Sequence, residues 1–140
     1  MIGIVIVAHG GLAREYLAAL EHVVGKHPGT AAVSIDANDD CGSKQVEVDA
    51  ALVAVDQGEG VVVVVDMFGS TPANLAMIAS QKMPNSRVLC GANLPLLVKL
   101  AKARELPLAE ACTSALTAGR KYINSVDRLG HVETPVAPLI

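Results

Sequence analysis

The chain has 140 residues, the length of one ordinary domain, and its composition excludes several classes of protein. Apolar residues make up 51% of the chain and charged residues 18%, whereas a disordered protein has few apolar residues and a high net charge. The formal net charge is −3 and aromatic residues make up 2%, so the composition does not provide the basic surface and stacking rings of a nucleic-acid binder. We therefore expect a single domain with an aliphatic core and no nucleic-acid partner.

The chain begins with an apolar run, residues 2–8, which has no basic flank and is too short for a membrane span or a signal peptide. We interpret it as a buried strand and expect no membrane insertion. The three cysteines, Cys41, Cys90 and Cys112, lie far apart and form no CxxC pair. This pattern favours free thiols in the cytoplasm over a disulfide framework or a zinc site.

Further apolar runs alternate with polar or glycine-rich breaks and helical patterns. The predicted strands, in chain order, are residues 2–8, 31–35, 61–65 and 87–90. The helical periodicity predicts helices over residues 12–24, 43–56, 72–82, from about 95 onward, and 108–126. Residues 61–65 are all valine, and a strand without polar alternation is covered on both faces, as at the centre of a parallel sheet.

Repeated strand–helix units predict the fold class and the domain organisation. Parallel strands joined by right-handed crossovers give a three-layer α/β sandwich, with a mostly parallel central sheet flanked by helices. No repeat or linker indicates a second domain. We assign residues 1–128 to one domain and residues 129–140 to a C-terminal tail.

Polar side chains stand at the carboxyl ends of the predicted strands, where open α/β sheets bind their ligands. His9 follows the first strand and Asp66 the third, so we expect them at one edge of the sheet on neighbouring strands. The other polar residues at this edge are Asp36, Asp39, Asp40 and Asn93.

His9 and Asp66 together predict a nucleophilic histidine. Gly10 and Gly11 leave the imidazole of His9 uncrowded. A carboxylate after five buried valines needs a partner, because desolvating an unpaired charge is costly. A carboxylate that accepts a hydrogen bond from one imidazole nitrogen leaves the lone pair of the other nitrogen free to attack. Each residue alone has a structural interpretation: His9 could cap a helix or fill a turn, and Asp66 could cap the turn that follows it.

The segment Gly69-Ser70-Thr71-Pro72 adds a site for an anion. Pro72 suits the first position of a helix and Thr71 suits its N-cap, which is also the arrangement of an ordinary cap. Free amides, the helix dipole and two hydroxyl groups favour an anion there. With His9 and Asp66, this predicts a phosphoryl group carried on His9 and bound by Gly69, Ser70 and Thr71.

Metal and cofactor sites are not expected. None of the remaining histidines, His22, His27 and His131, pairs with another histidine or a cysteine at metal-ligand spacing. GxGxxG and Walker motifs are absent after every predicted strand.

Three blocks of sequence resemble the mannose-family enzyme IIA of the bacterial phosphoenolpyruvate-dependent phosphotransferase system. They are residues 4–10, 65–72 and 91–97, in order along roughly residues 1–125. The resemblance implies that His9 takes a phosphoryl group through Nε2 from the phosphocarrier HPr and hands it to enzyme IIB, with Asp66 as the orienting carboxylate. It implies that Thr71 replaces the family's serine hydroxyl and that Ser70 replaces a glycine. It also implies a homodimer with an exchanged C-terminal strand, which the sequence of the tail does not place.

Other functions stay open at this point. An enzyme IIA without an attached IIB either serves a separate IIB or acts as a phosphorylation-dependent regulator. A receiver domain with Asp66 as phosphate acceptor is disfavoured, because the position that should hold an acidic pair for Mg²⁺ reads Ala8-His9. A small-molecule binding module or hydrolase is a further alternative. The phosphotransfer subunit of dihydroxyacetone kinase shares an early histidine but is disfavoured by the block at residues 69–72.

Overall fold

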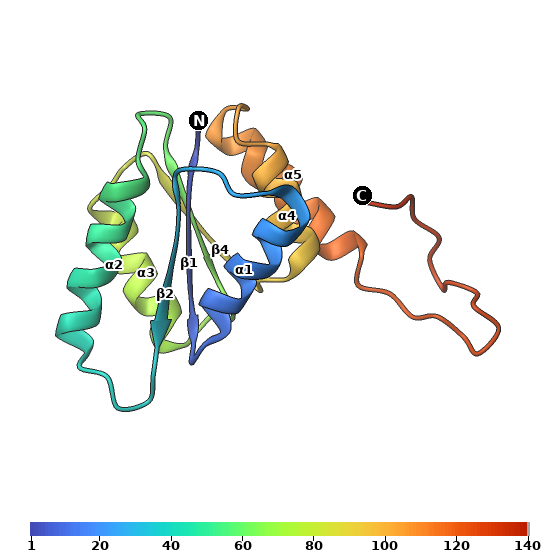
Figure 1. Cartoon of the computed structure of the whole chain (residues 1–140), viewed down its shortest axis with the longest axis horizontal. Helices are drawn as coiled ribbons and strands as arrows, with labels where there is room; N and C mark the ends of the chain where they lie inside the picture. The colour runs from blue at the N-terminus through green and yellow to red at the C-terminus, as the bar shows by residue number, and fades with distance from the viewer. Residues whose placement is uncertain (140) are drawn as a thin grey trace.

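A four-stranded parallel sheet lies at the centre of the computed structural model, which describes residues 1–139 (Figure 1). The strands are β1 (Gly3–His9), β2 (Thr30–Ile35), β3 (Val61–Val65) and β4 (Ser86–Cys90), in the spatial order β2-β1-β3-β4. The helices are α1 (Leu12–Val24), α2 (Cys41–Val55), α3 (Thr71–Gln81), α4 (Leu94–Lys102) and α5 (Leu108–Lys121). The predicted three-layer α/β sandwich is confirmed, and every strand pair is parallel.

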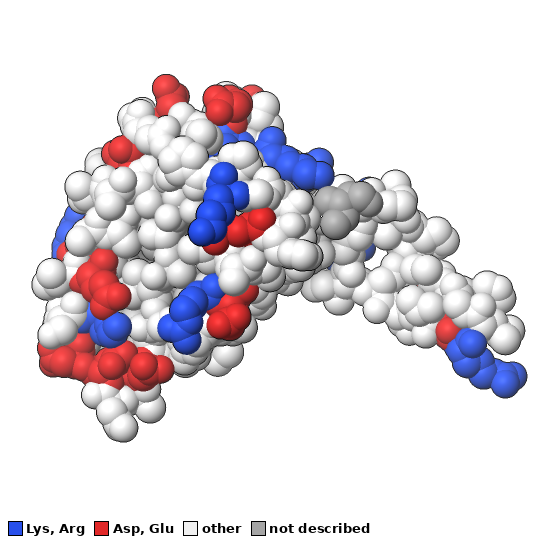
Figure 2. All heavy atoms as spheres, viewed as in Figure 1, with Lys and Arg blue, Asp and Glu red and all other residues white. Residues whose placement is uncertain are grey.

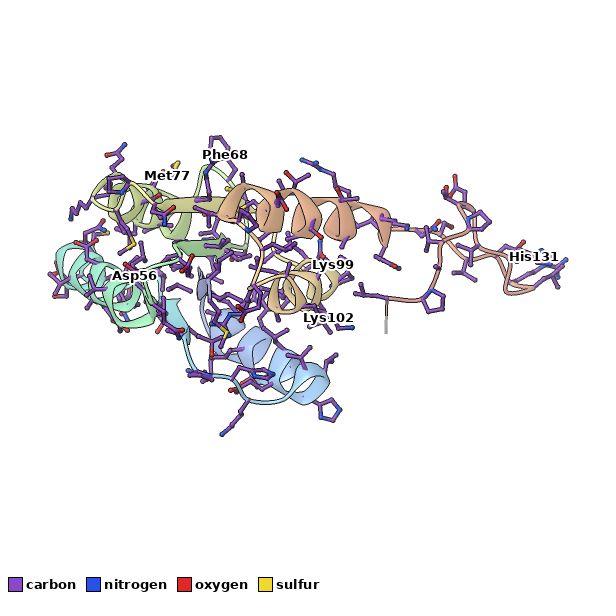
Figure 3. All side chains as sticks on the ribbon, turned by 90° about the horizontal axis from the view of Figure 1, so that it is seen from above. Asp56, Phe68, Met77, Lys99, Lys102 and His131 are labelled. Carbon is purple, nitrogen blue, oxygen red and sulfur yellow. The ribbon has the colours of Figure 1, made fainter. Side chains whose placement is uncertain are left out.

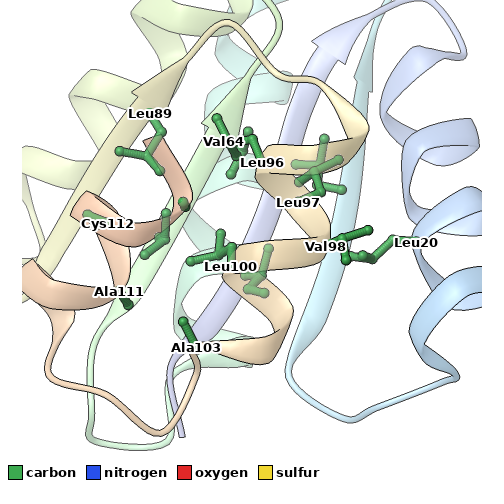
Figure 4. Packing of buried hydrophobic residues seen from close by; sticks show 14 of the residues in the cluster. Leu20, Val64, Leu89, Leu96, Leu97, Val98, Leu100, Ala103, Ala111 and Cys112 are labelled. Atoms are coloured by element: carbon green, nitrogen blue, oxygen red, sulfur yellow. The ribbon is translucent and has the colours of Figure 1, made fainter. Parts of the chain in front are cut away.

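Two aliphatic cores fill the space between the sheet and its helices. The helices α2 and α3 cover one face, while α1, α4 and α5 cover the other (Figure 1). Figure 4 shows the second core, where Leu20 of α1 meets Val98 of α4. All five valines of β3 are fully buried, because this strand lies between β1 and β4 and is covered on both faces.

The alternation of side chains along β1 determines on which face of the sheet His9 lies. Ile4 and Ile6 belong to the core under α1, α4 and α5, whereas Val5 and Val7 belong to the core under α2 and α3. Successive residues of a strand point to opposite faces, so residues two apart share a face. His9 therefore falls on the side of α2 and α3.

Two helix boundaries differ from the sequence prediction by more than one residue. α2 begins at Cys41, two residues before the predicted start at Ser43, because Asp40 is the N-cap and accepts a hydrogen bond from the amide of Ser43 at 2.9 Å. α5 ends at Lys121, so the predicted end at Val126 is wrong. Just beyond Lys121 the apolar residues Ile123 and Val126 find no core to pack on and are 74% and 61% exposed.

The segment after α5 extends away from the body of the molecule (Figure 1). Within residues 122–139 the only strand-like pairing is one antiparallel bridge between Val126 and Val132. The end of this segment returns toward α5, where Tyr122 Oη donates a hydrogen bond to the carbonyl oxygen of Ala137 at 2.8 Å. Over the part of the chain that the structure describes, no helix has the length and hydrophobicity to cross a membrane.

Candidate active site

The site is centred on a hydrogen-bonded pair from adjacent strands. His9 ends β1, Asp66 follows β3, and these strands are neighbours, as predicted. The Oδ2 atom of Asp66 lies 2.6 Å from His9 Nδ1 and also accepts a hydrogen bond from the backbone amide of His9 at 3.0 Å. The Oδ1 atom accepts from the backbone amide of Met67 at 3.0 Å. The carboxylate of Asp66 is thus directed at His9, rather than acting only as the cap of the turn that follows it.

The protonation of this pair follows from its surroundings. Burial of the Asp66 side chain, which is 11% exposed, acts to raise its pKa. The hydrogen bonds from His9 and Met67 outweigh this effect, so the pKa of Asp66 lies below its ordinary value. Because a carboxylate only accepts hydrogen bonds, the shared proton sits on Nδ1 of His9. In the neutral ring the lone pair is then on Nε2, which no group among residues 1–139 hydrogen-bonds, and the His9 side chain is 49% exposed.

A pocket of about 330 Å³ adjoins His9 between the carboxyl ends of β1 and β2 and the first turns of α2 and α3. The residues that line it come from these four elements and the loops before the helices. They are His9, Gly10, Ile35, Asp36, Ala37, Asp39, Cys41, Lys44, Thr71 and Leu75. Of the three residues predicted to bind phosphate, the structure brings Thr71 into the pocket with His9, whereas Gly69 and Ser70 are not among its lining residues.

The start of α3 differs from the predicted arrangement. Ser70, not Thr71, is the N-cap, and Thr71 is the first helical residue. The hydroxyl of Ser70 donates to the carbonyl oxygen of Met67 at 2.6 Å, so it does not cap the helix amides. Asp40 and Asn93, in contrast, accept hydrogen bonds from first-turn amides of α2 and α4 at 2.9 and 3.0 Å. The first turn of α3 therefore has no side-chain cap and presents amide groups suited to an anion.

Two pocket residues, Lys44 and Cys41, were missed by sequence reasoning. Both lie in the first turns of α2. Because the sequence prediction starts this helix at Ser43, it does not place these two residues at the carboxyl edge of the sheet. Asp36 and Asp39 line the pocket, in agreement with their predicted place at this edge. Asn93 does not line it, because its side chain caps α4 and donates to the carbonyl oxygen of Gly119 at 3.2 Å.

The surface around the pocket is acidic on one side and apolar on the other. Acidic side chains gather at the lower left of the body in Figure 2, where Figure 1 has the β2–α2 loop. Met67 and Phe68, next to Asp66, are 58% and 74% exposed, and Phe68 stands at the surface in Figure 3. Among residues 1–139 no group of three or more histidine, cysteine, aspartate or glutamate side chains is placed to hold a metal ion.

The fold and the pair define an α/β protein with a histidine hydrogen-bonded to an aspartate at the carboxyl edge of a parallel sheet. Residues 3–117 match the EIIA-man family, described as the PTS system fructose IIA component. The mannose-specific EIIAB component of the phosphotransferase system from Escherichia coli K12 is 28% identical over 104 residues, 74% of this chain and 32% of that protein. YadI from the same strain, named as a phosphotransferase enzyme IIA component, is 32% identical over 105 residues, 75% of this chain and 72% of that protein.

Solved structures agree with this match. The mannose/sorbose-specific IIA subunit from Enterococcus faecalis has a TM-score of 0.80 and 28% identity, covering 89% of this chain and 94% of that chain. The EIIA component from Streptococcus agalactiae has a TM-score of 0.78 at 24% identity, covers 91% of this chain and 97% of that chain, and supports the fold alone. The chain belongs to the EIIA-man family of phosphotransferase system IIA components. It spans about a third of the length of the mannose-specific relatives that it matches.

Proposed function

We propose that this protein is a phosphohistidine carrier of a mannose-family sugar phosphotransferase system. In this proposal His9 accepts a phosphoryl group from HPr on Nε2 and passes it to an enzyme IIB. The observation that carries the proposal is the 2.6 Å contact between His9 Nδ1 and Asp66, which leaves Nε2 as the free nucleophilic nitrogen beside the pocket. Family membership supports the same chemistry.

The transfer step balances without a metal or a cofactor. The Nε2 lone pair of His9 forms a bond to phosphorus, and the bond from phosphorus to the donor's histidine nitrogen breaks, its electron pair returning to that nitrogen. His9 keeps its Nδ1 proton, so the ring becomes cationic as the phosphoryl group arrives. The negative charge of Asp66 stabilises this cation through the hydrogen bond already in place. Because donor and acceptor are both phosphohistidines of similar energy, orientation matters more than a large lowering of the barrier.

The phosphoryl oxygens are proposed to bind at the start of α3. Thr71 supplies a hydroxyl group from within the pocket, and the uncapped first turn supplies backbone amides. The backbone at Gly69 and Ser70 forms the approach to this turn. Gly69 has a φ of 81°, a left-handed conformation that favours glycine, so the loop depends on a glycine here.

A homodimer is the second part of the proposal. The edge strand β4 pairs only with β3 among residues 1–139, so its outer edge can accept another strand. The segment beyond α5 carries exposed apolar side chains on Ile123, Val126 and Leu129, which are 61–74% exposed in the single chain. Burying them on a second copy would remove this apolar surface from water. Sedimentation of the intact chain and of a chain ending at Lys121 tests this: we expect a dimer for the first and a monomer for the second, and a monomeric intact chain would exclude the dimer.

Transfer of phosphate from phosphoenolpyruvate through enzyme I and HPr tests the carrier function. Intact mass should show a gain of one phosphate on the wild type and none on His9→Ala. No gain on the wild type, with the carriers active on a control acceptor, would exclude the function. Adding a candidate enzyme IIB separates a transport component from a phosphorylation-dependent regulator, because only the transport component loses the phosphate to IIB.

A further inference from the structure

The pocket beside His9 contains one basic side chain. Lys44 lines this pocket together with His9, and within the described chain it is the one lysine or arginine that does so. Its side chain is 22% exposed. The other charged residues that line the pocket are Asp36 and Asp39, both acidic.

Lys44 retains hydrogen-bond donors for a ligand. An ammonium group has three N–H donors. One is used by Glu47, whose Oε2 atom lies 2.9 Å from Nζ. Asp39 Oδ2 lies 3.8 Å from Nζ, which is beyond hydrogen-bond distance although the two charges still attract. Two donors of Lys44 are thus unused among residues 1–139.

The partners of Lys44 keep it charged without immobilising it. The hydrogen bond that Lys44 donates to Glu47, aided by the nearby carboxylates, holds the pKa of Lys44 above its ordinary value. Glu47 itself is 51% exposed, so solvent screens this ion pair and it contributes little to holding the side chain. Lys44 can therefore move toward a stronger anion in the pocket.

Such a cation would stabilise a phosphoryl group on His9. The phosphoryl group brings a charge of about −2 near neutral pH. Asp36 and Asp39 line the same pocket and Asp66 lies behind the ring, so every carboxylate there repels the phosphoryl group. The hydroxyl of Thr71 and the first turn of α3 offer dipoles, but no full positive charge.

We propose that Lys44 is the cationic residue that binds the phosphoryl group carried by His9. This inference rests on the proposed carrier function. Lys44 stays protonated throughout and transfers no proton; it neutralises part of the phosphoryl charge with its unused donors. The phosphorylated protein is stabilised as a result, and the equilibrium with the donor shifts toward it.

The experiment compares three variants with the wild type, and each is phosphorylated by phospho-HPr and, separately, by phosphoramidate. Lys44→Met removes the charge and Lys44→Arg keeps it. Lys82→Met is the matched control, because Lys82 also forms an ion pair, with Asp49 at 2.6 Å, but does not line the pocket. Phosphoramidate is a small donor, so an effect seen with it does not depend on docking of a protein partner.

We expect Lys44→Met to lower the equilibrium constant for transfer from HPr about tenfold, the loss of one charge-assisted hydrogen bond. Phosphorylation by phosphoramidate should slow by a similar factor. The pKa of the bound phosphoryl group, read by ³¹P NMR, should rise because its dianion loses a cation. Lys44→Arg should stay within about threefold of the wild type, since the charge is kept and only the geometry differs. Lys82→Met should behave like the wild type.

Two results would overturn the role of Lys44 while leaving the carrier function intact. One is unchanged phosphorylation and an unchanged phosphoryl pKa in Lys44→Met. The other is a loss with phospho-HPr alone, which would assign Lys44 to partner docking. A wild type that takes phosphate from neither donor would instead overturn the carrier function, and the inference with it.

Discussion

His9 and His131 each direct the ring Nδ1 and the backbone amide toward one aspartate, but the two pairs are held in different ways. In the first pair Asp66 is 57 residues away in the sequence, and the ring contact is 2.6 Å. In the second pair Asp127 is four residues away, and the ring contact is 3.2 Å. His131 lies at the far end of the extended C-terminal segment, well away from the sheet (Figure 3).

The difference between the pairs shows what the fold adds to a local motif. Asp66 is 11% exposed and Asp127 is 53% exposed, so water screens the second pair far more than the first. The pKa of Asp127 is lowered mainly by the backbone amide of His131, whereas at Asp66 hydrogen bonding has to overcome the effect of burial. A histidine–aspartate contact is therefore not sufficient by itself to indicate a functional site.

The two histidines also differ in the charged and polar groups that surround them. The hollow at His131 is lined by residues of the C-terminal segment alone and includes Asp127 and Glu133, with no lysine or arginine. The pocket at His9 has Lys44 and the uncapped start of α3. Beside His9 the carboxylates of Asp36 and Asp39 are accompanied by a cation and by free helix amides, whereas beside His131 both charged lining residues, Asp127 and Glu133, are acidic.

The largest expected effect comes from exchanging each histidine for glutamine. His9→Gln should abolish the gain of one phosphate from phospho-HPr, because the nucleophilic nitrogen is lost. His131→Gln should be phosphorylated at the wild-type rate, because its pair contributes no nucleophile. Intact mass spectrometry over time measures both. Phosphate remaining on His9→Gln, and missing from the double variant, would show that the local pair is sufficient and that the comparison is wrong.

The next largest effect should come from the two aspartates. Asp66→Asn keeps the size of the side chain but removes the charge that stabilises the cationic ring, so transfer should slow by about 10- to 100-fold. Asp127→Asn should leave the rate unchanged. Rates come from quenched time points with phospho-HPr, and circular dichroism confirms that both variants are folded. Equal rates of phosphoryl transfer for Asp66→Asn and the wild type would exclude an orienting role for Asp66.

Most of the fold could be predicted from the sequence because hydrophobic patterns encode it directly. The valine run at β3 predicts a buried central strand, and the structure places it between two other strands. The end of α5 could not be predicted in this way. Ile123 and Val126 continue an apolar pattern, but a helix persists only where such residues find a surface to pack on.

The candidate site could be predicted from the sequence only in part, because some of its residues are placed by strand ends and others by helix starts. The carboxyl ends of parallel strands meet at one edge, so His9 and Asp66 could be paired from their positions alone. Lys44 could not, because its place depends on where α2 begins, and the capping role of Asp40 moves that start by two residues. Thr71 was assigned to the cap that Ser70 occupies, since the two hydroxyl residues are adjacent and equally suited to it.

A smaller effect is expected at Thr71, which lines the pocket together with His9. Thr71→Ala removes one neutral hydroxyl donor from the pocket, so transfer to His9 should slow by about three- to tenfold. Thr113→Ala is a suitable control: its hydroxyl donates within α5 to the carbonyl oxygen of Ala109, away from the pocket. Both rates are measured as for the aspartate variants. A rate for Thr71→Ala equal to that of the control would exclude the hydroxyl contact.

The smallest expected effect concerns stability in acid. The pKa of folded Asp66 lies below the ordinary value of 3.8, so the pair stabilises the fold above that pH and this contribution is lost as the pH falls through the folded-state pKa. The wild type should therefore exceed Asp66→Asn in free energy of unfolding at about pH 6, and the gap should narrow toward about pH 3. Urea denaturation at both pH values measures it. For Asp127→Asn, whose carboxylate is 53% exposed, the difference from the wild type should be small at both pH values. A constant gap for Asp66→Asn would mean that the stabilisation comes from the shape of the side chain, because only the charge of the carboxylate depends on pH.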